Sequence, residues 1–172
     1  QYNHTLNWYS SQFWTNKVGV DTLALQKEFK HKAALRTGCL ELLQYLKQHG
    51  YACWIATNAD REGLKFKLEH TQIAAYFDVI VSSESIGYPK EDLRFWQKLQ
   101  ALHPFQIKSS YFIDDTEKVL AAAEKFGIQH LISIAQPSSL AAVRTESAYP
   151  MLTDLSDLMV MLKHAEDLKI YA

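Results

Sequence analysis

Apolar side chains recur at helical spacing through the first 36 residues. Between residues 4 and 18 they fall every three or four positions, which predicts one amphipathic helix; they are Leu6, Tyr9, Phe13 and Trp14. Gly19 can end this helix in a left-handed conformation. Asp21 or Thr22 can cap a second helix that runs to about residue 35, because a short side-chain oxygen accepts from the first unpaired backbone N–H groups. The two helices would form a hairpin.

The pattern changes after a third predicted helix, which ends at Gly50. Short apolar runs now alternate with helical patterns, and they lie at residues 51–57, 78–82, 110–113 and 128–134. The first run lacks polar alternation, as is typical of a strand covered on both faces, so we expect it to be central in its sheet. Helices should fill the intervals and the segment after Pro150, with a loop at 83–90. The alternation predicts an α/β fold with a parallel sheet.

Polar side chains stand directly after three of the predicted strands. They are Thr57 with Asn58, Lys90 in the loop after the second run, and Asp114 with Asp115. Because ligands of open parallel sheets bind beyond the carboxyl ends of the strands, these residues should surround one site. A hydroxyl, an ammonium group and two carboxylates can hold a phosphoryl group together with Mg²⁺.

Each of these residues also has a purely structural interpretation. Thr57 could cap the following helix, since threonine is common at that position. Lys90 could be a solvated loop lysine. Asp114 and Asp115 favour a cation more strongly, because adjacent carboxylates repel each other unless positive charge lies near them.

Composition narrows the class of protein further. The 172 residues are 48% hydrophobic and 22% charged, enough apolar material for one well-buried domain. Eighteen basic and nineteen acidic residues are interspersed, which argues against a nucleic-acid-binding surface. No apolar run reaches membrane-spanning length and the start does not resemble a signal peptide, so we expect a cytoplasmic protein with no membrane partner. Cys39 and Cys53 should be reduced packing residues.

Three stretches together resemble the haloacid-dehalogenase-like hydrolase superfamily. WIATNA resembles its second motif, GYPKEDLRFW its third and FIDDTEKVLAAAEKFGI its fourth, in the family's order. HTLNWY, FKLEHTQI and GYPKED further resemble bacterial GMP/IMP nucleotidases of this superfamily. The resemblance implies a three-layer Rossmann-like core at residues 37–172, preceded by part of an α-helical cap at residues 1–36.

The resemblance also implies roles for the matched residues. Thr57 and Asn58 would bind the phosphoryl oxygens, and Lys90 would neutralise the nucleophile and the transferring group. Asp114 and Asp115 would hold Mg²⁺, with Asp115 the direct ligand. The expected activity is hydrolysis of a small-molecule phosphate monoester, a purine 5′-nucleotide such as GMP or IMP, with Thr57 and Lys90 as catalytic residues. A sugar-phosphate phosphatase of the same superfamily is the alternative.

The aromatic side chains near the N-terminus have two interpretations. Trp8, Tyr9, Phe13 and Trp14 could stack on a purine base, as aromatic rings do on unpaired bases, but side chains at this spacing are more often core. The seven histidines show no ligand spacing, and none is assigned to a metal.

The superfamily's first motif, an apolar strand ending in Asp-x-Asp, has no match. VGVDTLAL comes nearest, but Leu23 stands where the second carboxylate is needed, and Asp21 is better explained as a helix cap. In the family this strand lies mid-sheet, between the strands that end here at Thr57 and Ile113. We therefore expect residues upstream of Gln1, or another segment, to complete the sheet. Without the nucleophilic aspartate the chain alone should be inactive, or a noncatalytic module that binds phosphate or a partner.

Overall fold

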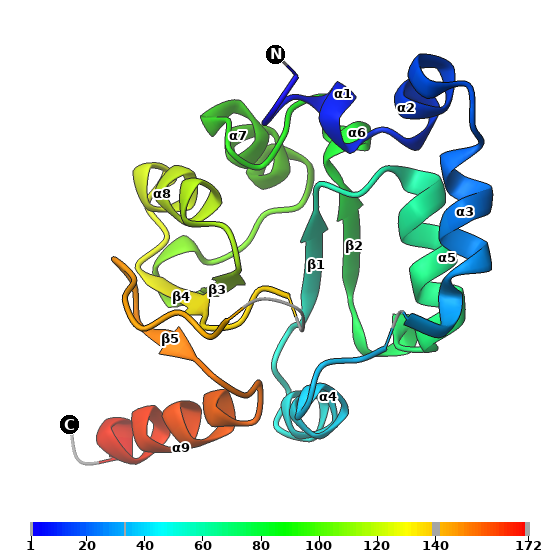
Figure 1. The fold of residues 1–172 in the computed structure, drawn as a ribbon. Helices are drawn as coiled ribbons and strands as arrows, with labels where there is room; N and C mark the ends of the chain where they lie inside the picture. Colours follow the sequence, from blue (N-terminus) through cyan, green and yellow to red (C-terminus); the bar gives the residue numbers. More distant parts are fainter. Residues whose placement is uncertain (1, 33, 139–141, 171–172) are drawn as a thin grey trace.

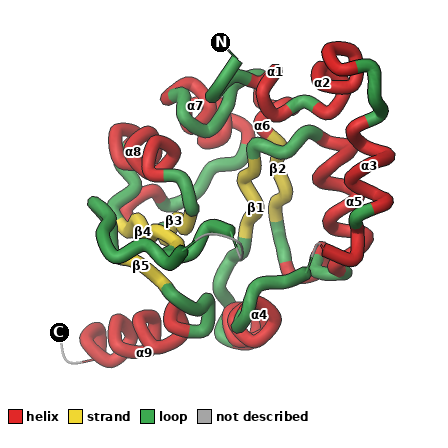
Figure 2. The backbone as a smooth tube through the Cα atoms, in the orientation of Figure 1, coloured by secondary structure: helices red, strands yellow, loops and turns green. Residues whose placement is uncertain are grey.

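Two parallel sheets and the helices around them make up the computed structural model, which describes residues 2–32, 34–138 and 142–170 (Figure 1). One sheet pairs β1 (Trp54–Thr57) with β2 (Val79–Ser82). The other has the order β3 (Tyr111–Asp114), β4 (His130–Ile134), β5 (Met151–Leu152). The four predicted strands and the α/β class are confirmed, and Figure 2 shows the strands as two separate groups.

Helices connect the strands in the predicted order. The core helices are α4 (Cys39–Gln48), α5 (Arg61–Thr71), the short α6 (Ser83–Ile86), α7 (Leu93–Leu102), α8 (Glu117–Phe126) and α9 (Asp157–Ile170). None of the helices in the described ranges is long and apolar enough to cross a membrane.

Successive side chains of β4 point into two different apolar clusters. Leu131 packs with Phe95, Trp96 and Leu120 of α7 and α8. Ile132 and Ile134 pack with α4 and α9. The partner side chains include Leu42, Leu158 and Leu162. This alternation is the two-residue period of a strand, so the second sheet is covered on both faces and the region has three layers.

The N-terminal hairpin differs from its prediction. The expected single helix is two helices, α1 (Leu6–Tyr9) and α2 (Ser11–Val18), because Ser10 adopts an extended conformation and caps α2 by accepting from the Phe13 N–H at 3.1 Å. Gly19 ends α2 at φ 73°, as predicted. Asp21 caps α3 (Thr22–Glu28), which is shorter than expected because Phe29 closes it and a 3₁₀ turn, Lys30–Lys32, follows.

Three further expectations need correction. Within the described residues β1 hydrogen-bonds only to β2, so there it is an edge strand rather than a central one, and its side chains are half-buried. The segment 83–90 is not all loop, because Ser82 caps the single turn α6, which Gly87 ends at φ 88°. A fifth strand, β5, was missed because two residues are too short to show a period.

Gly38 joins the hairpin to α4, which lies at the end of the molecule away from the carboxyl ends of β1 and β2 (Figure 1). Its φ is 73°, and an added Cβ would lie 2.6 Å from the Ser156 backbone nitrogen and closer still to Asp154 Oδ1. Both the backbone angle and the space therefore require glycine here.

Replacement of a buried and an exposed leucine of α7 should separate core from surface. Leu99 is 3% exposed and Leu102 is 61% exposed. Leu99→Ala should lower the free energy of unfolding by about 2–5 kcal/mol, through lost burial and the cavity left behind. Leu102→Ala should change it by less than about 0.5 kcal/mol. Urea denaturation measures both, and equal losses would contradict the assignment of Leu99 to the core.

Candidate active site

A cleft of about 450 Å³ opens at the carboxyl ends of β1 and β3. All five residues selected from the sequence line it: Thr57, Asn58, Lys90, Asp114 and Asp115. The hairpin contributes the other wall, through Tyr9, Ser11 and Gln26. A larger hollow of about 570 Å³ lies between α5 and β2, but it contains none of these five residues.

The loop after β1 is held by hydrogen bonds from three directions. Thr57 Oγ1 accepts from the Ala59 N–H at 3.1 Å, and Ser82 Oγ donates to the Ala59 carbonyl at 2.6 Å. The cap of α5 is Asp60, which accepts from the Gly63 N–H at 2.8 Å. A cap role for Thr57 is therefore excluded, and its side chain lines the cleft.

Asn58 holds the next loop in place with both ends of its amide. Its Oδ1 accepts from the Lys90 backbone N–H at 2.9 Å, and its Nδ2 donates to Glu91 Oε2 at 2.9 Å. The Lys90 carbonyl accepts from the indole N–H of the buried Trp96 at 2.8 Å. Both backbone polar groups of Lys90 are thus fixed, which sets the direction of its side chain.

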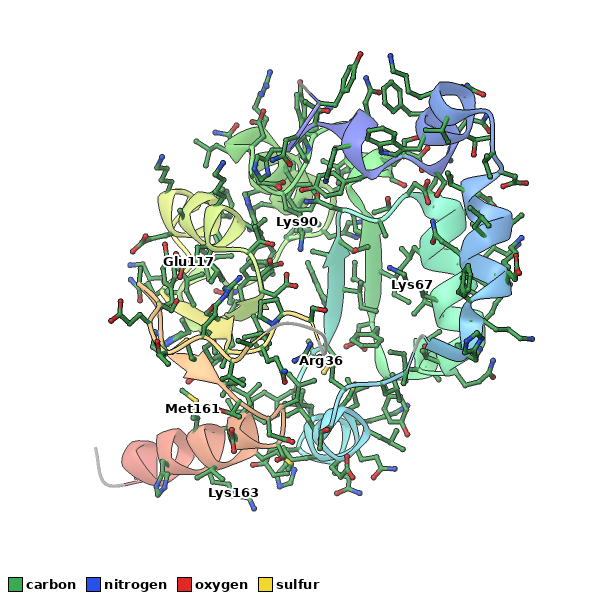
Figure 3. The ribbon with its side chains drawn as sticks, viewed as in Figure 1. Arg36, Lys67, Lys90, Glu117, Met161 and Lys163 are labelled. Atoms are coloured by element: carbon green, nitrogen blue, oxygen red, sulfur yellow. The ribbon has the colours of Figure 1, made fainter. Side chains whose placement is uncertain are left out.

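Lys90 and Asp114 form a buried ion pair across the cleft. Lys90 Nζ donates to Asp114 Oδ2, and the two side chains are 10% and 7% exposed. Figure 3 shows Lys90 near the carboxyl end of β1. Burial raises the pKa of Asp114 above its usual range, although the Lys90 ammonium and the Thr116 N–H, which donates to Oδ1 at 2.9 Å, oppose the shift. The pair brings the ends of the two sheets together.

Asp115 differs from its neighbour because it is exposed to solvent. Thr116 Oγ1 donates to its Oδ1 at 3.2 Å. Within the described part of the chain no cluster of three or more His, Cys, Asp or Glu side chains could hold a metal. Two carboxylates nevertheless suit Mg²⁺, which keeps several waters and takes remaining ligands from substrate phosphate.

Two polar residues that bond to groups of the site, Glu91 and His4, were not selected from the sequence. Glu91, with 9% of its side chain exposed, accepts from the Tyr9 hydroxyl and from His4 Nδ1 at 3.1 Å. Burial alone would raise the pKa of Glu91, but the hydrogen bonds from Tyr9, Asn58 and His4 together lower it. Burial of Tyr9 and the adjacent Glu91 carboxylate raise the pKa of the Tyr9 hydroxyl. The position of Glu91 directly after Lys90 was the only available signal.

The aromatic cluster divides between the site and the hairpin interior. Only Tyr9 of the four lines the cleft. Trp14 packs edge-on against Trp8 and Phe13, with ring centroids 5.5 and 5.4 Å apart, and its indole N–H donates to the Trp8 carbonyl at 2.8 Å. Those three rings stabilise the hairpin. Cys39 and Cys53 are free thiols, as predicted.

The chain belongs to the haloacid dehalogenase-like hydrolase family, whose sequence profile matches residues 6–132. The GMP/IMP nucleotidase YrfG of Escherichia coli is 36% identical over 159 residues, which are 92% of this chain and 72% of that protein. Its Shigella flexneri counterpart gives the same values.

Solved structures support the fold. A HAD phosphatase from Thermococcus onnurineus superposes with a TM-score of 0.76 over 91% of this chain and 72% of its own, at 18% identity. The HAD hydrolase YfnB from Bacillus subtilis, in a structure bound to magnesium, gives a TM-score of 0.62 over 73% of this chain and 54% of its own, at 19% identity. The predicted Rossmann-like fold is therefore confirmed, and the chain spans only part of each relative.

Removal of the Lys90 ammonium should strongly destabilise the fold. Lys90→Met leaves Asp114 buried without its counter-charge, which should cost about 3–5 kcal/mol. Adding Asp114→Asn, which keeps an acceptor for the Thr116 N–H, should recover most of this loss. Urea denaturation with an unchanged m-value measures both. If the free energy of unfolding of Lys90→Met alone were within about 1 kcal/mol of wild type, the pair would not be buried as described.

Glu91 should give stability that depends on pH in one direction. Its folded-state pKa is lowered. Ionised Glu91 therefore contributes stability that is fully present above the unfolded-state pKa of about 4.3. This contribution is lost as the pH falls through the lower folded-state pKa. The difference in the free energy of unfolding between wild type and Glu91→Gln should be constant from about pH 7 to 5 and shrink below about pH 4. A difference that grows on acidification would contradict the network around Glu91.

Proposed function

We propose that this protein, in its complete form, hydrolyses purine 5′-nucleotides such as GMP and IMP in the presence of Mg²⁺. The observation that carries the proposal is the convergence of Thr57, Lys90 and Asp115 on one cleft at the ends of two parallel sheets. The 36% identity to a GMP/IMP nucleotidase over nearly the whole chain supports the choice of substrate.

Each residue has a physical role in this proposal. The Lys90 ammonium, fixed by its backbone contacts, places positive charge where a phosphoryl group would enter. The Thr57 hydroxyl can donate to a phosphoryl oxygen from the same side. Preorganised groups of this kind stabilise the charge that develops in phosphoryl transfer.

Asp115 and Asp114 would hold the Mg²⁺, with Asp115 as the direct ligand because Asp114 already accepts from Lys90 and Thr116. The metal would supply neutralisation of charge on the phosphate oxygens. One similar structure is described as bound to magnesium, which supports this cofactor.

The nucleophile would come from an additional strand. The described strands β1 and β3 each have one hydrogen-bonded neighbour, yet their carboxyl ends share the cleft. We propose that a strand ending in Asp-x-Asp completes the sheet between them, one carboxylate forming the phosphoaspartyl intermediate and the other acting as general acid and base. In this division residues 1–36 are part of a cap and residues 37–172 the core. The 172-residue chain alone would then bind phosphate without turning it over.

The test assays phosphate release from GMP, IMP, AMP, CMP and glucose 6-phosphate, with and without EDTA. It uses protein from the complete reading frame, whose intact mass is compared with the 19.7 kDa of this chain. GMP and IMP should be the best substrates, and EDTA should abolish their hydrolysis. Release from glucose 6-phosphate alone would replace the proposal by a sugar-phosphate phosphatase. Turnover by the 19.7 kDa chain itself would overturn the need for a further aspartate.

Replacement of the site lysine should lower catalysis far more than binding. Lys90→Met should reduce kcat for GMP by about 10²- to 10³-fold, the usual effect of removing one donor to a transition-state oxyanion. Lys65→Met serves as the matched control, because Lys65 is an exposed lysine of α5 that lines the other hollow. Its kcat should match wild type, and equal losses in the two variants would reject the role of Lys90.

A further inference from the structure

The carboxylate of Glu91 joins the hairpin to the loop that carries Lys90. Oε1 accepts from Tyr9 and His4, which belong to the hairpin, and Oε2 accepts from Asn58, which belongs to the loop after β1. Three donors on a side chain that is 9% exposed are a specific arrangement rather than a solvated surface carboxylate.

The tautomer of the His4 ring follows from its two partners. The Lys118 ammonium lies 3.0 Å from Nε2 and has only protons to offer, so Nε2 is assigned as the acceptor and Nδ1 carries the proton that is donated to Glu91. Lys118 belongs to α8, directly after the Asp114 to Thr116 segment. The hairpin is therefore bound at once to both sides of the cleft.

Hydrogen bonds, joined through the side chains of Asn58 and Lys90, connect this carboxylate to the proposed phosphate site. Asn58 connects Glu91 to the Lys90 backbone, and the Lys90 ammonium reaches Asp114. Asp60 also holds the hairpin, by accepting from the Ser11 N–H, but its other bond is to Gly63 within α5. Of these two tethers, the one at Glu91 leads to Lys90.

We propose that Glu91 is a positioning residue that couples docking of the first arm of the hairpin, residues 2–18, to phosphate binding at Lys90. The proposal rests on the phosphate site proposed above. The docked hairpin and the bound phosphate each favour the same arrangement of the two loops that carry Asn58 and Lys90, so each strengthens the other. Such coupling is reciprocal: whatever factor the docked hairpin adds to phosphate affinity, phosphate must add to hairpin docking.

The experiment measures two quantities on the full 172-residue chain. Titration calorimetry gives the affinity for inorganic phosphate in Mg²⁺, and hydrogen exchange gives the protection of amides in residues 4–18 with and without phosphate. In wild type, phosphate should slow exchange in this segment. In Glu91→Gln the affinity should fall at least about 5-fold, the lower end of usual couplings. The segment should exchange faster, and phosphate should no longer protect it.

Two further variants separate coupling from loss of structure. Tyr9→Phe removes a single donor on the hairpin side and should weaken phosphate binding in the same direction, with little added effect in the Glu91→Gln background. Glu84→Gln is the matched control, because Glu84 pairs with Arg61 rather than with the hairpin. Its phosphate affinity and segment protection should equal those of wild type.

The outcomes are distinguishable. Unchanged affinity and protection in Glu91→Gln would overturn the coupling. Faster exchange in β4 as well as in the hairpin would do the same, since it would indicate general destabilisation. Phosphate binding that survives Lys90→Met undiminished, in protein shown to be folded by circular dichroism, would instead reject the phosphate site itself.

Discussion

The ion pair between Lys90 and Asp114 sets the conditions for the rest of the cleft. Two charges taken out of water cost several kcal/mol each unless their remaining polar atoms are satisfied. Here the neighbouring contacts supply that satisfaction: Thr116 bonds the carboxylate, while Asn58 and Trp96 hold the backbone from which the ammonium extends. The pair also spans the two sheets, which share no hydrogen bond between their described strands. Much of the local sequence is explained by the need to bury this pair.

The apolar and polar parts of the molecule have separate tasks. The side chains of α7 and α8, packed on β4, give the loops a rigid base, and Trp96 belongs to both parts because its ring is buried while its N–H bonds Lys90. None of the helices α1, α2 and α3 has a buried residue, and the hairpin bonds to the Asp60 and Glu91 carboxylates of the core. We expect an element held in this way to respond more readily than the core to what occupies the cleft.

The sequence predicted the parts that depend on local pattern. Strand positions follow from apolar runs bounded by turn residues, and parallel strands must bring Thr57, Lys90 and Asp114 to one edge. What it could not predict depends on particular contacts. Ser10 breaks a helix whose apolar spacing is continuous, since a side-chain cap there replaces a backbone bond. Asn58 lines the cleft as expected, but the bonds that both ends of its amide make to the loop after α6 could not be predicted. The roles of Glu91 and His4 arise from residues more than 80 positions apart.

Gly38 has a consequence for how two distant parts of the chain pack. The chain enters α4 through this residue, and a β-carbon there would collide with Asp154 and Ser156 in the loop before α9. The bare backbone therefore lets the start of α4 approach that loop, and side chains of α4 and α9 share one apolar cluster. A single missing methyl group thus sets how closely a helix near residue 40 can approach the segment that leads into the last helix.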